Sequence, residues 1–455
     1  MIKKFIRRIL GRKEKLDNGT DPLILGPKEH GIDPQLVSPN AVRVTQTLQD
    51  AGFKAFLVGG AVRDLLLGIK PKDFDIATNA TPEQVKRLFR RAFIIGRRFQ
   101  IVHVMFGQDL LEVTTFRGAS SEGAIKDEHG RVLRDNTFGE QHEDAIRRDF
   151  TINAMYYDPA TQSVLDYHGG MADIRNKKLR VIGVPEARYR EDPVRLLRVV
   201  RFAAKLDFTI DSATRAPISV MAPLINNVPA ARVFDEMLKL LMSGHALACL
   251  HQLRKEGLHH GLLPLLDVVL EQPLGEKFVR LALASTDARI QQGKPVSPGF
   301  LFASLLWHQV VEKWNAYQAA GEYPIPALHL AADDVLSSQT EKLALQRKIA
   351  SDMRDIWAMQ PRFERRTGKS PYKLLENMRL RAGYDFLLLR CASGEIDSEL
   401  GEWWTAFIDA DATGREALIA SKPKSGSTSG SAKKRSRGRG GRGRAKEPVV
   451  NEGGE

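Results

Sequence analysis

The chain is poor in cysteine and has no long apolar run. Its two cysteines, Cys249 and Cys391, stand far apart, and neither belongs to a Cys-x-x-Cys pair. This spacing argues against a disulfide framework and a zinc site, and it predicts a protein of a reducing compartment. No apolar stretch approaches the roughly 20 residues that cross a bilayer, and none ends at an export-type cleavage site. The sequence therefore predicts a soluble, cytoplasmic protein.

Histidine at metal-ligand spacing is also lacking. His103, His142 and the pair His259–His260 have no second ligand at a standard distance along the chain. We interpret these side chains as core or surface residues rather than ligands of a transition metal.

Positive charge is concentrated at the two ends of the chain. The formal net charge is +13, while residues 1–16 carry seven Lys/Arg against one Glu and residues 421–455 carry ten against three. Such ends predict arms that hold a polyanion by releasing its counterions. The N-terminal arm also alternates basic and apolar residues, so weak contact with an anionic membrane surface is an alternative to a solvated arm.

The 455 residues exceed one hydrophobic core and predict an α+β protein of several units. The first third shows the periodicities of a mixed α/β head, and almost everything after about residue 185 has helical period. The tail is rich in Arg and Gly, so we expect it to be disordered and either to contact RNA or to aid solubility. The predicted division is a basic arm and lead-in at 1–40, a head at 41–180, a helical neck at 181–245, a helical body at 246–420 and the tail at 421–455.

Within the head, the sequence predicts alternating strands and helices. Helices are expected at 41–51 and 61–68, with a third that starts at its N-cap Thr81. Strands are expected in FKAFLVGG, DFDIAT, IIGRRFQIVHVMFG and LLEVTTFRG. A mobile loop is predicted over 119–143, and the segments DAIRRDFTINAMYY and EDPVRLLRVVRFAAKL are predicted to be helical.

Gly59 and Gly60 end a predicted strand and open a predicted helix. Their backbone N–H groups can therefore approach a phosphate closely at a helix N-terminus, and Arg63 falls on the first turn. Most strand-Gly-Gly-helix turns bind nothing, so this motif is weak evidence by itself.

Asp73 and Asp75 follow this turn and flank Phe74. If DFDI is a strand, both carboxylates lie on one face, while Phe74 and Ile76 enter the core. Neighbouring like charges repel, and Mg²⁺, which prefers oxygen ligands, relieves the repulsion. An isolated Asp-x-Asp usually belongs to a turn; the preceding Gly-Gly turn makes this one more specific.

A two-metal site needs a further carboxylate, and two candidates remain open. Glu112 lies on a neighbouring predicted strand, and Asp149 follows Arg147 and Arg148. The alternatives are a surface strand residue for Glu112 and an ordinary helix salt bridge for Asp149.

The ordered series GGAVRDLLLG, DFD, EVTTFRG, RRDFTINAMYYD and REDPVRLLRVVRFA resembles the motifs of the class II nucleotidyltransferase superfamily, over roughly residues 40–420. That superfamily contains bacterial poly(A) polymerases and CCA-adding enzymes. The resemblance implies a nucleotidyltransferase head, a neck that binds nucleotide and RNA, and a body that binds RNA. It implies that Asp73 and Asp75 bind catalytic Mg²⁺, that Gly59, Gly60 and Arg63 bind the triphosphate, and that Asp149 with Arg148 binds the sugar end and completes the carboxylates.

The family's base-reading element matches Glu191, Asp192 and Arg195. Asp192 as acceptor and Arg195 as donor could mimic a pairing partner for adenine. Without the resemblance, a Glu191/Arg195 helix pair is the simpler interpretation.

Three activities remain to be separated. The basic pair Arg97–Arg98 before a strand resembles the form in bacterial poly(A) polymerases, and the Arg-rich tail suits an enzyme that acts on many RNAs. Both favour a polymerase that adds AMP from ATP to RNA 3′ ends, with release of pyrophosphate. The alternatives are a tRNA CCA-adding enzyme and a catalytically silent RNA-binding relative. Expected partners are RNA 3′ ends and ATP, together with RNA-degradation or RNA-chaperone proteins.

Overall fold

The computed structural model describes residues 21–96, 100–118, 125–126, 132–134, 137–258, 273–343 and 345–421. Several features that the sequence singled out lie outside these residues: most of the N-terminal arm, the pair Arg97–Arg98, the pair His259–His260 and nearly all of the basic tail. Within the described residues, no helix is long and apolar enough to cross a membrane.

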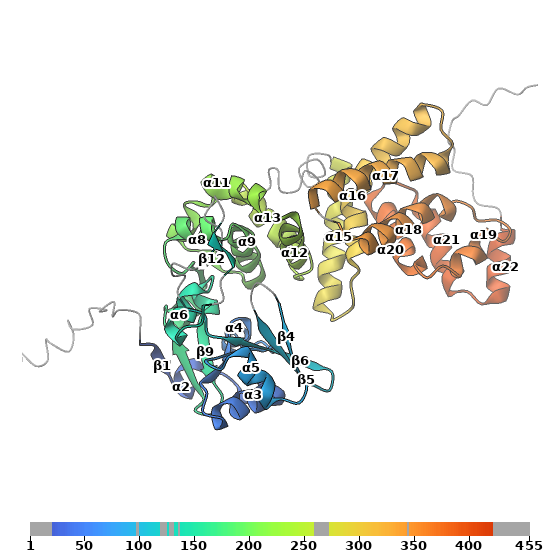
Figure 1. Cartoon of the computed structure of the whole chain (residues 1–455). Coiled ribbons are helices and arrows are strands. Elements are labelled where there is room, and N and C mark those ends of the chain that lie inside the picture. The colour runs from blue at the N-terminus through green and yellow to red at the C-terminus, as the bar shows by residue number, and fades with distance from the viewer. Residues whose placement is uncertain are drawn as a thin grey trace, which may run out of the picture.

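The head is built on one mixed sheet of eight strands (Figure 1). Its spatial order is β1-β10-β9-β2-β3-β6-β5-β4. The β3–β6 pair is parallel, and the other neighbours run antiparallel. The strands are β1 (Leu23–Leu25), β2 (Ala55–Val58), β3 (Asp75–Thr78), β4 (Ala92–Ile95), β5 (Ile101–Phe106), β6 (Asp109–Thr115), β9 (Met155–Asp158) and β10 (Ser163–Asp166).

Helices of the head follow the sequence signals closely. Helix α3 (Pro39–Asp50) begins at the N-cap Ser38, and α4 (Gly60–Leu66) leaves the Gly-Gly turn. Helix α5 (Pro82–Leu88) has the predicted N-cap Thr81, whose hydroxyl accepts a hydrogen bond from the Gln84 N–H in a capping box. The apolar sides of these helices and of the sheet form one core, which continues through the neck into the body.

Three local expectations were wrong. We expected regular structure to begin near Asn40, after the lead-in, but it begins earlier, because β1 pairs with β10 and extends the sheet. The segment 144–157 is not one helix: α6 (Gln141–Arg147) ends early, and Met155–Asp158 is strand β9, which the sheet pairs on both sides. The expected loop over 119–143 contains the start of α6 and the paired strands β7 (Ile125–Lys126) and β8 (Val132–Arg134).

The neck and body are helical, as expected. The neck contains α8 (Pro185–Glu191), α9 (Val194–Leu206), α10 (Ser212–Arg215), α11 (Ile218–Met221) and α12 (Ala230–Leu241), and its short strand β12 (Thr209–Ile210) pairs with β11 (Lys178–Leu179) of the head. The described helices of the body are α13 (Ala246–Lys255), α15 (Pro273–Gln291), α16 (Pro298–Ala319), α17 (Pro324–Leu343), α18 (Arg347–Phe363), α19 (Ser370–Leu375), α20 (Leu380–Ser393), α21 (Ser398–Asp409) and α22 (Ala412–Ala420).

Helices α9 and α12 stand between the sheet of the head and the body helices (Figure 1). The amphipathic helix expected at 191–206 is divided, because Glu191 ends α8, Asp192 caps it and α9 begins at Val194. The neck therefore presents the end of α8, the start of α9 and the length of α9 to the head. The domain boundaries at 180, 245 and 420 stay predictions.

Candidate active site

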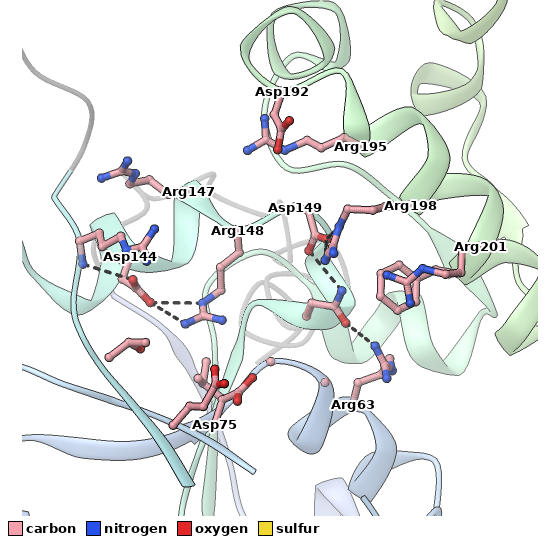
Figure 2. Close-up of a pocket in the computed structure, with 18 of the residues that line it drawn as sticks. Arg63, Asp75, Asp144, Arg147, Arg148, Asp149, Asp192, Arg195, Arg198 and Arg201 are labelled. Carbon is pink, nitrogen blue, oxygen red and sulfur yellow. Dashed lines mark hydrogen bonds and ion pairs between the residues drawn. The ribbon is translucent and has the colours of Figure 1, made fainter. Parts of the chain in front are cut away.

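A cavity of about 850 Å³ lies between the head sheet and the neck helices (Figure 2). The described residues that line it include nine arginine and lysine side chains and six carboxylates. Cations therefore outnumber anions, which suits an occupant with several negative charges. Apart from Asp73, every site residue that the sequence predicted lines this cavity.

The Gly59–Gly60 turn forms one edge of the cavity and joins β2 to α4. Gly59 has φ +76° and ψ −134°, a conformation that residues with a Cβ avoid. A Cβ at Gly59 would also lie 3.5 Å from Arg148 Nη1 and 3.9 Å from Asp75 Oδ2. Glycine thus keeps this corner open beside the carboxylate.

Asp75 and Glu112 are direct neighbours on the cavity side of the sheet. The parallel pair β3–β6 sets Asp75 opposite Glu112, and both side chains line the cavity. Burial and the Glu112 charge raise the pKa of Asp75 to about 6, although Arg148 acts in the opposite direction. The surroundings of Asp75 therefore supply too little positive charge to balance its ionised carboxylate.

Asp73 precedes this strand, which begins at Asp75 rather than at Asp73. Its side chain is exposed, and its charge also raises the pKa of Asp75. Phe74 and Ile76 are buried, as the predicted alternation requires. The Asp-x-Asp pair thus faces away from the core.

Within the described residues, no group of three or more histidine, cysteine, aspartate or glutamate side chains forms a ready-made metal site. The carboxylates nevertheless fit Mg²⁺, which is usually held by one or two carboxylates and completes its shell with water and substrate phosphates. The raised pKa of Asp75 is the observation that favours a cation here.

Asp149 has a different environment from Asp75. Arg198 of α9 donates from Nε at 2.8 Å to Oδ2 of Asp149, and the Asn153 amide and the Phe150 N–H donate to Oδ1 (Figure 2). Burial acts to raise the pKa of Asp149, but Arg198 and these hydrogen bonds lower it to about 2. Asp149 therefore links the head to the neck as a permanent anion.

Arg148 lies between the Asp144 carboxylate and the Asp75–Glu112 pair. Its guanidinium donates to Asp144 at 2.8 Å and contacts the Tyr156 hydroxyl, which itself donates to Asp144 at 2.6 Å. Although burial opposes it, Asp144 raises the pKa of Arg148 above its ordinary value. Arg148 is a fixed cation that faces Asp75 across the Gly59 corner.

Arg63 forms part of the cavity wall but is firmly held by neighbours. Its guanidinium pairs with Asp64 at 2.6 Å, donates to Asn153 at 2.8 Å and lies 5.1 Å from the centroid of the Phe202 ring. The side chain is only 4% exposed. Arg63 therefore supplies a preorganised positive charge behind the Gly-Gly turn.

The expected base-reading residues lie where α8 meets α9. Arg195 donates to Glu191 at 3.0 Å and to the Arg188 carbonyl at 2.7 Å. The contact with Glu191 is the simple helix pair that the sequence allowed. Both oxygens of Asp192 accept from Arg232 of α12 at 3.1 Å. The two groups line the cavity from the neck.

Sequence reasoning missed several cavity residues. Arg198, Arg201 and Lys205 continue from Arg195 along one side of α9, at steps of three or four residues. That helical spacing was a readable signal. Arg232 gave no such signal, because only the folded chain brings α12 to Asp192.

Three family models match the chain. "Poly A polymerase head domain" matches residues 55–180, "Probable RNA and SrmB- binding site of polymerase A" matches 207–270 and "Polymerase A arginine-rich C-terminus" matches 320–442. Together they cover parts of the head, neck, body and tail.

Curated relatives and solved structures agree with these matches. The chain is 43% identical to poly(A) polymerase I of Salmonella typhi, over 89% of this chain and 91% of the relative. The corresponding values for Haemophilus influenzae poly(A) polymerase I are 40%, 91% and 94%. A CCA-adding enzyme of Lactobacillus helveticus is 38% identical, over 45% of this chain and 50% of its own length.

A crystal structure of the Bacillus stearothermophilus CCA-adding enzyme in complex with CTP shares the fold. Its TM-score is 0.53 at 27% identity, with 84% of this chain and 92% of that chain covered. CCA-adding enzymes are thus related through the superfamily, whereas the match to poly(A) polymerases extends over nearly the whole chain. The chain belongs to the poly(A) polymerase I family of enzymes.

Proposed function

We propose that the protein adds AMP units from ATP to RNA 3′ ends, without a template, and releases pyrophosphate. The carrying observation is the cavity that sets the Asp75–Glu112 pair against an arginine-rich wall. The near full-length likeness to poly(A) polymerases supports ATP and general RNA as substrates over CTP and tRNA. We further propose that the tails promote RNA turnover in the cytoplasm.

Each part of the cavity has a role in this proposal. Asp73, Asp75 and Glu112 would hold Mg²⁺, which supplies charge neutralisation at the reacting phosphate. The N–H groups of the Gly59–Gly60 turn and the Arg63 charge orient the triphosphate. Preorganised cations of this kind stabilise charge that develops on the leaving pyrophosphate.

We assign the third carboxylate to Glu112 rather than to Asp149. Glu112 lies beside Asp75 and raises its pKa, whereas Asp149 is neutralised by Arg198. Asp149 then acts with Arg148 by fixing the cavity wall near the sugar. The Asp192 carboxylate accepts from the adenine amino group, and Arg195 donates to the ring nitrogen.

The test supplies pure protein with Mg²⁺, a generic RNA and each nucleotide separately. We expect long tails from ATP alone. Addition of a few C residues to tRNA, without ATP-derived tails, would instead support the CCA-adding alternative. Asp75→Asn should remove the activity and leave RNA binding intact; a protein that binds RNA and incorporates no nucleotide is the silent relative.

A further inference from the structure

The sheet face that carries the carboxylates continues beyond the cavity toward β4. The strand register sets Asp75 opposite Glu112, Glu112 opposite His103 and His103 opposite Phe93. Directly opposed residues of adjacent strands point to the same side of a sheet. His103 Nε2 lies 3.4 Å from Glu112 Oε1, which agrees with this placement. One row therefore runs from the carboxylates to the edge strand.

The outer end of this face is apolar and open. Phe93 is 57% exposed and Ile95 is 46% exposed, and Ile101, opposite Ile95, is half-buried. The other face of the same strands is core, with Val102 and Val104 buried. Edge strands usually carry charge or proline on exposed positions, because an apolar edge invites unwanted association. The position of Phe93 and the two isoleucines on an open face beside the active site therefore needs an explanation.

The geometry of the reaction supplies that reason. The nucleotide cavity extends from the carboxylates toward the Gly59–Gly60 turn and the neck arginines. In phosphoryl transfer the attacking and leaving oxygens are roughly in line across the reacting phosphorus. A 3′ hydroxyl must therefore reach the carboxylates from the side away from the pyrophosphate, along β6, β5 and β4. Figure 1 shows β4 and β5 at the side of the head away from β1.

We propose that Phe93, Ile95 and Ile101 form a stacking shelf for the last bases of the RNA strand. This proposal rests on the proposed function. Three strand spacings separate β4 from β3, about 14 Å. At roughly 3.4 Å per nucleotide, that distance holds about four nucleotides. Aromatic and apolar platforms take bases of any sequence, as an enzyme that extends many RNAs requires.

The experiment uses the full chain and a hexanucleotide RNA primer, which is too short to gain much affinity from other parts of the protein. Phe93→Ala should raise the KM for this primer about fivefold to tenfold, the lower part of the range for the loss of one base–aromatic stack. The KM for ATP should change less than twofold. Phe93→Trp should restore the KM for the primer. An unchanged KM for the primer, or an equal rise in the KM for ATP, would overturn the shelf.

Leu23→Ala is the matched control, because Leu23 is 60% exposed on β1 at the opposite edge of the same sheet. It should change neither KM. Equal melting temperatures show that the variants fold alike.

A second measurement needs no turnover and separates the shelf from the proposed function. A hexanucleotide with 5-iodouridine at the fourth position from its 3′ end, the distance at which the RNA would reach β4, should cross-link to residues 92–95 of the wild-type protein on irradiation. Cross-links only outside β4 and β5 overturn the shelf, whether or not the protein extends RNA. A wild-type protein that cross-links at β4 but adds no AMP refutes the proposed activity and keeps the RNA site.

Discussion

Replacing Asp149 by asparagine removes the negative partner of Arg198 and keeps the shape of the side chain. The native pair is largely buried, with the Asp149 side chain 11% exposed. In the variant, the Arg198 guanidinium keeps a more distant carboxylate partner, Glu236 at 3.9 Å. Breaking such a pair from one side leaves a buried charge without full compensation.

The magnitude follows from the pKa of Asp149. The fold lowers this pKa from 3.8 to about 2. At about 1.4 kcal/mol per pKa unit, the ionised carboxylate contributes on the order of 2–3 kcal/mol to the free energy of unfolding. We expect Asp149→Asn to lose that amount, with the melting transition of the head falling by several degrees.

The sign of the pH dependence is fixed by the direction of the shift. Because the folded pKa of Asp149 lies below the unfolded value of 3.8, the stabilisation is complete above that value and is lost as pH falls through about 2. Wild type and variant should therefore differ by the same free energy from pH 5 to pH 8. Urea denaturation at several pH values measures this difference.

Asp192→Asn is the matched control for stability, because its ion pair with Arg232 is more exposed, at 27% and 38%. This variant should lose less than about 1 kcal/mol. A double-mutant cycle of Asp149→Asn with Arg198→Met should give a coupling energy above about 1 kcal/mol. Additive single effects, or an unchanged urea midpoint for Asp149→Asn, would refute the reasoning.

Three further changes test the site itself. Asp75→Asn should abolish AMP addition and yet raise the melting temperature in Mg²⁺-free buffer at pH 8, because the pKa of about 6 means that the ionised carboxylate opposes folding above that pH. Gly59→Ala should weaken ATP binding and lower stability by about 1–3 kcal/mol, because its backbone is left-handed; ATP titration and melting measure both. Arg232→Met should cut the ratio of kcat/KM for ATP to that for CTP about tenfold, because the Asp192 carboxylate, which Arg232 orients, can then turn freely. A tenfold change corresponds to roughly 1.4 kcal/mol.

Two of these changes have a control variant that the chain offers, and the pH dependence is the check on Asp75→Asn. Gly68→Ala adds a Cβ at φ +71° with open space around it, so it should lower stability without weakening ATP binding. Arg215→Met removes an equally exposed arginine, paired with Glu256, and should leave the choice between ATP and CTP unchanged. Three results would contradict the assignments. They are a Gly59→Ala variant that stays stable and binds ATP as tightly as wild type, a stabilising effect of Asp75→Asn that persists at pH 4, and equal selectivity for ATP over CTP in the two arginine variants.

Local signals in the sequence predicted much of the head. The cap at Thr81, the strand that ends just before Gly59 and the burial of Phe74 and Ile76 depend on backbone geometry and on a period of two, which neighbouring residues specify. The same kind of signal predicted a mixed head followed by helices. It misread 144–157, since Met155–Asp158 becomes a strand only because β2 and β10 pair with it.

By itself, the sequence determined the family, the mixed head with its helical remainder, and the residues from which a site could be built. Only the tertiary structure decided how those residues combine. The β3–β6 register sets Glu112 beside Asp75, and the packing of α9 brings Arg198 into contact with Asp149. Such choices depend on contacts between segments far apart in the chain, and no local propensity encodes strand register or helix docking. The same register extends the row from Asp75 to Phe93.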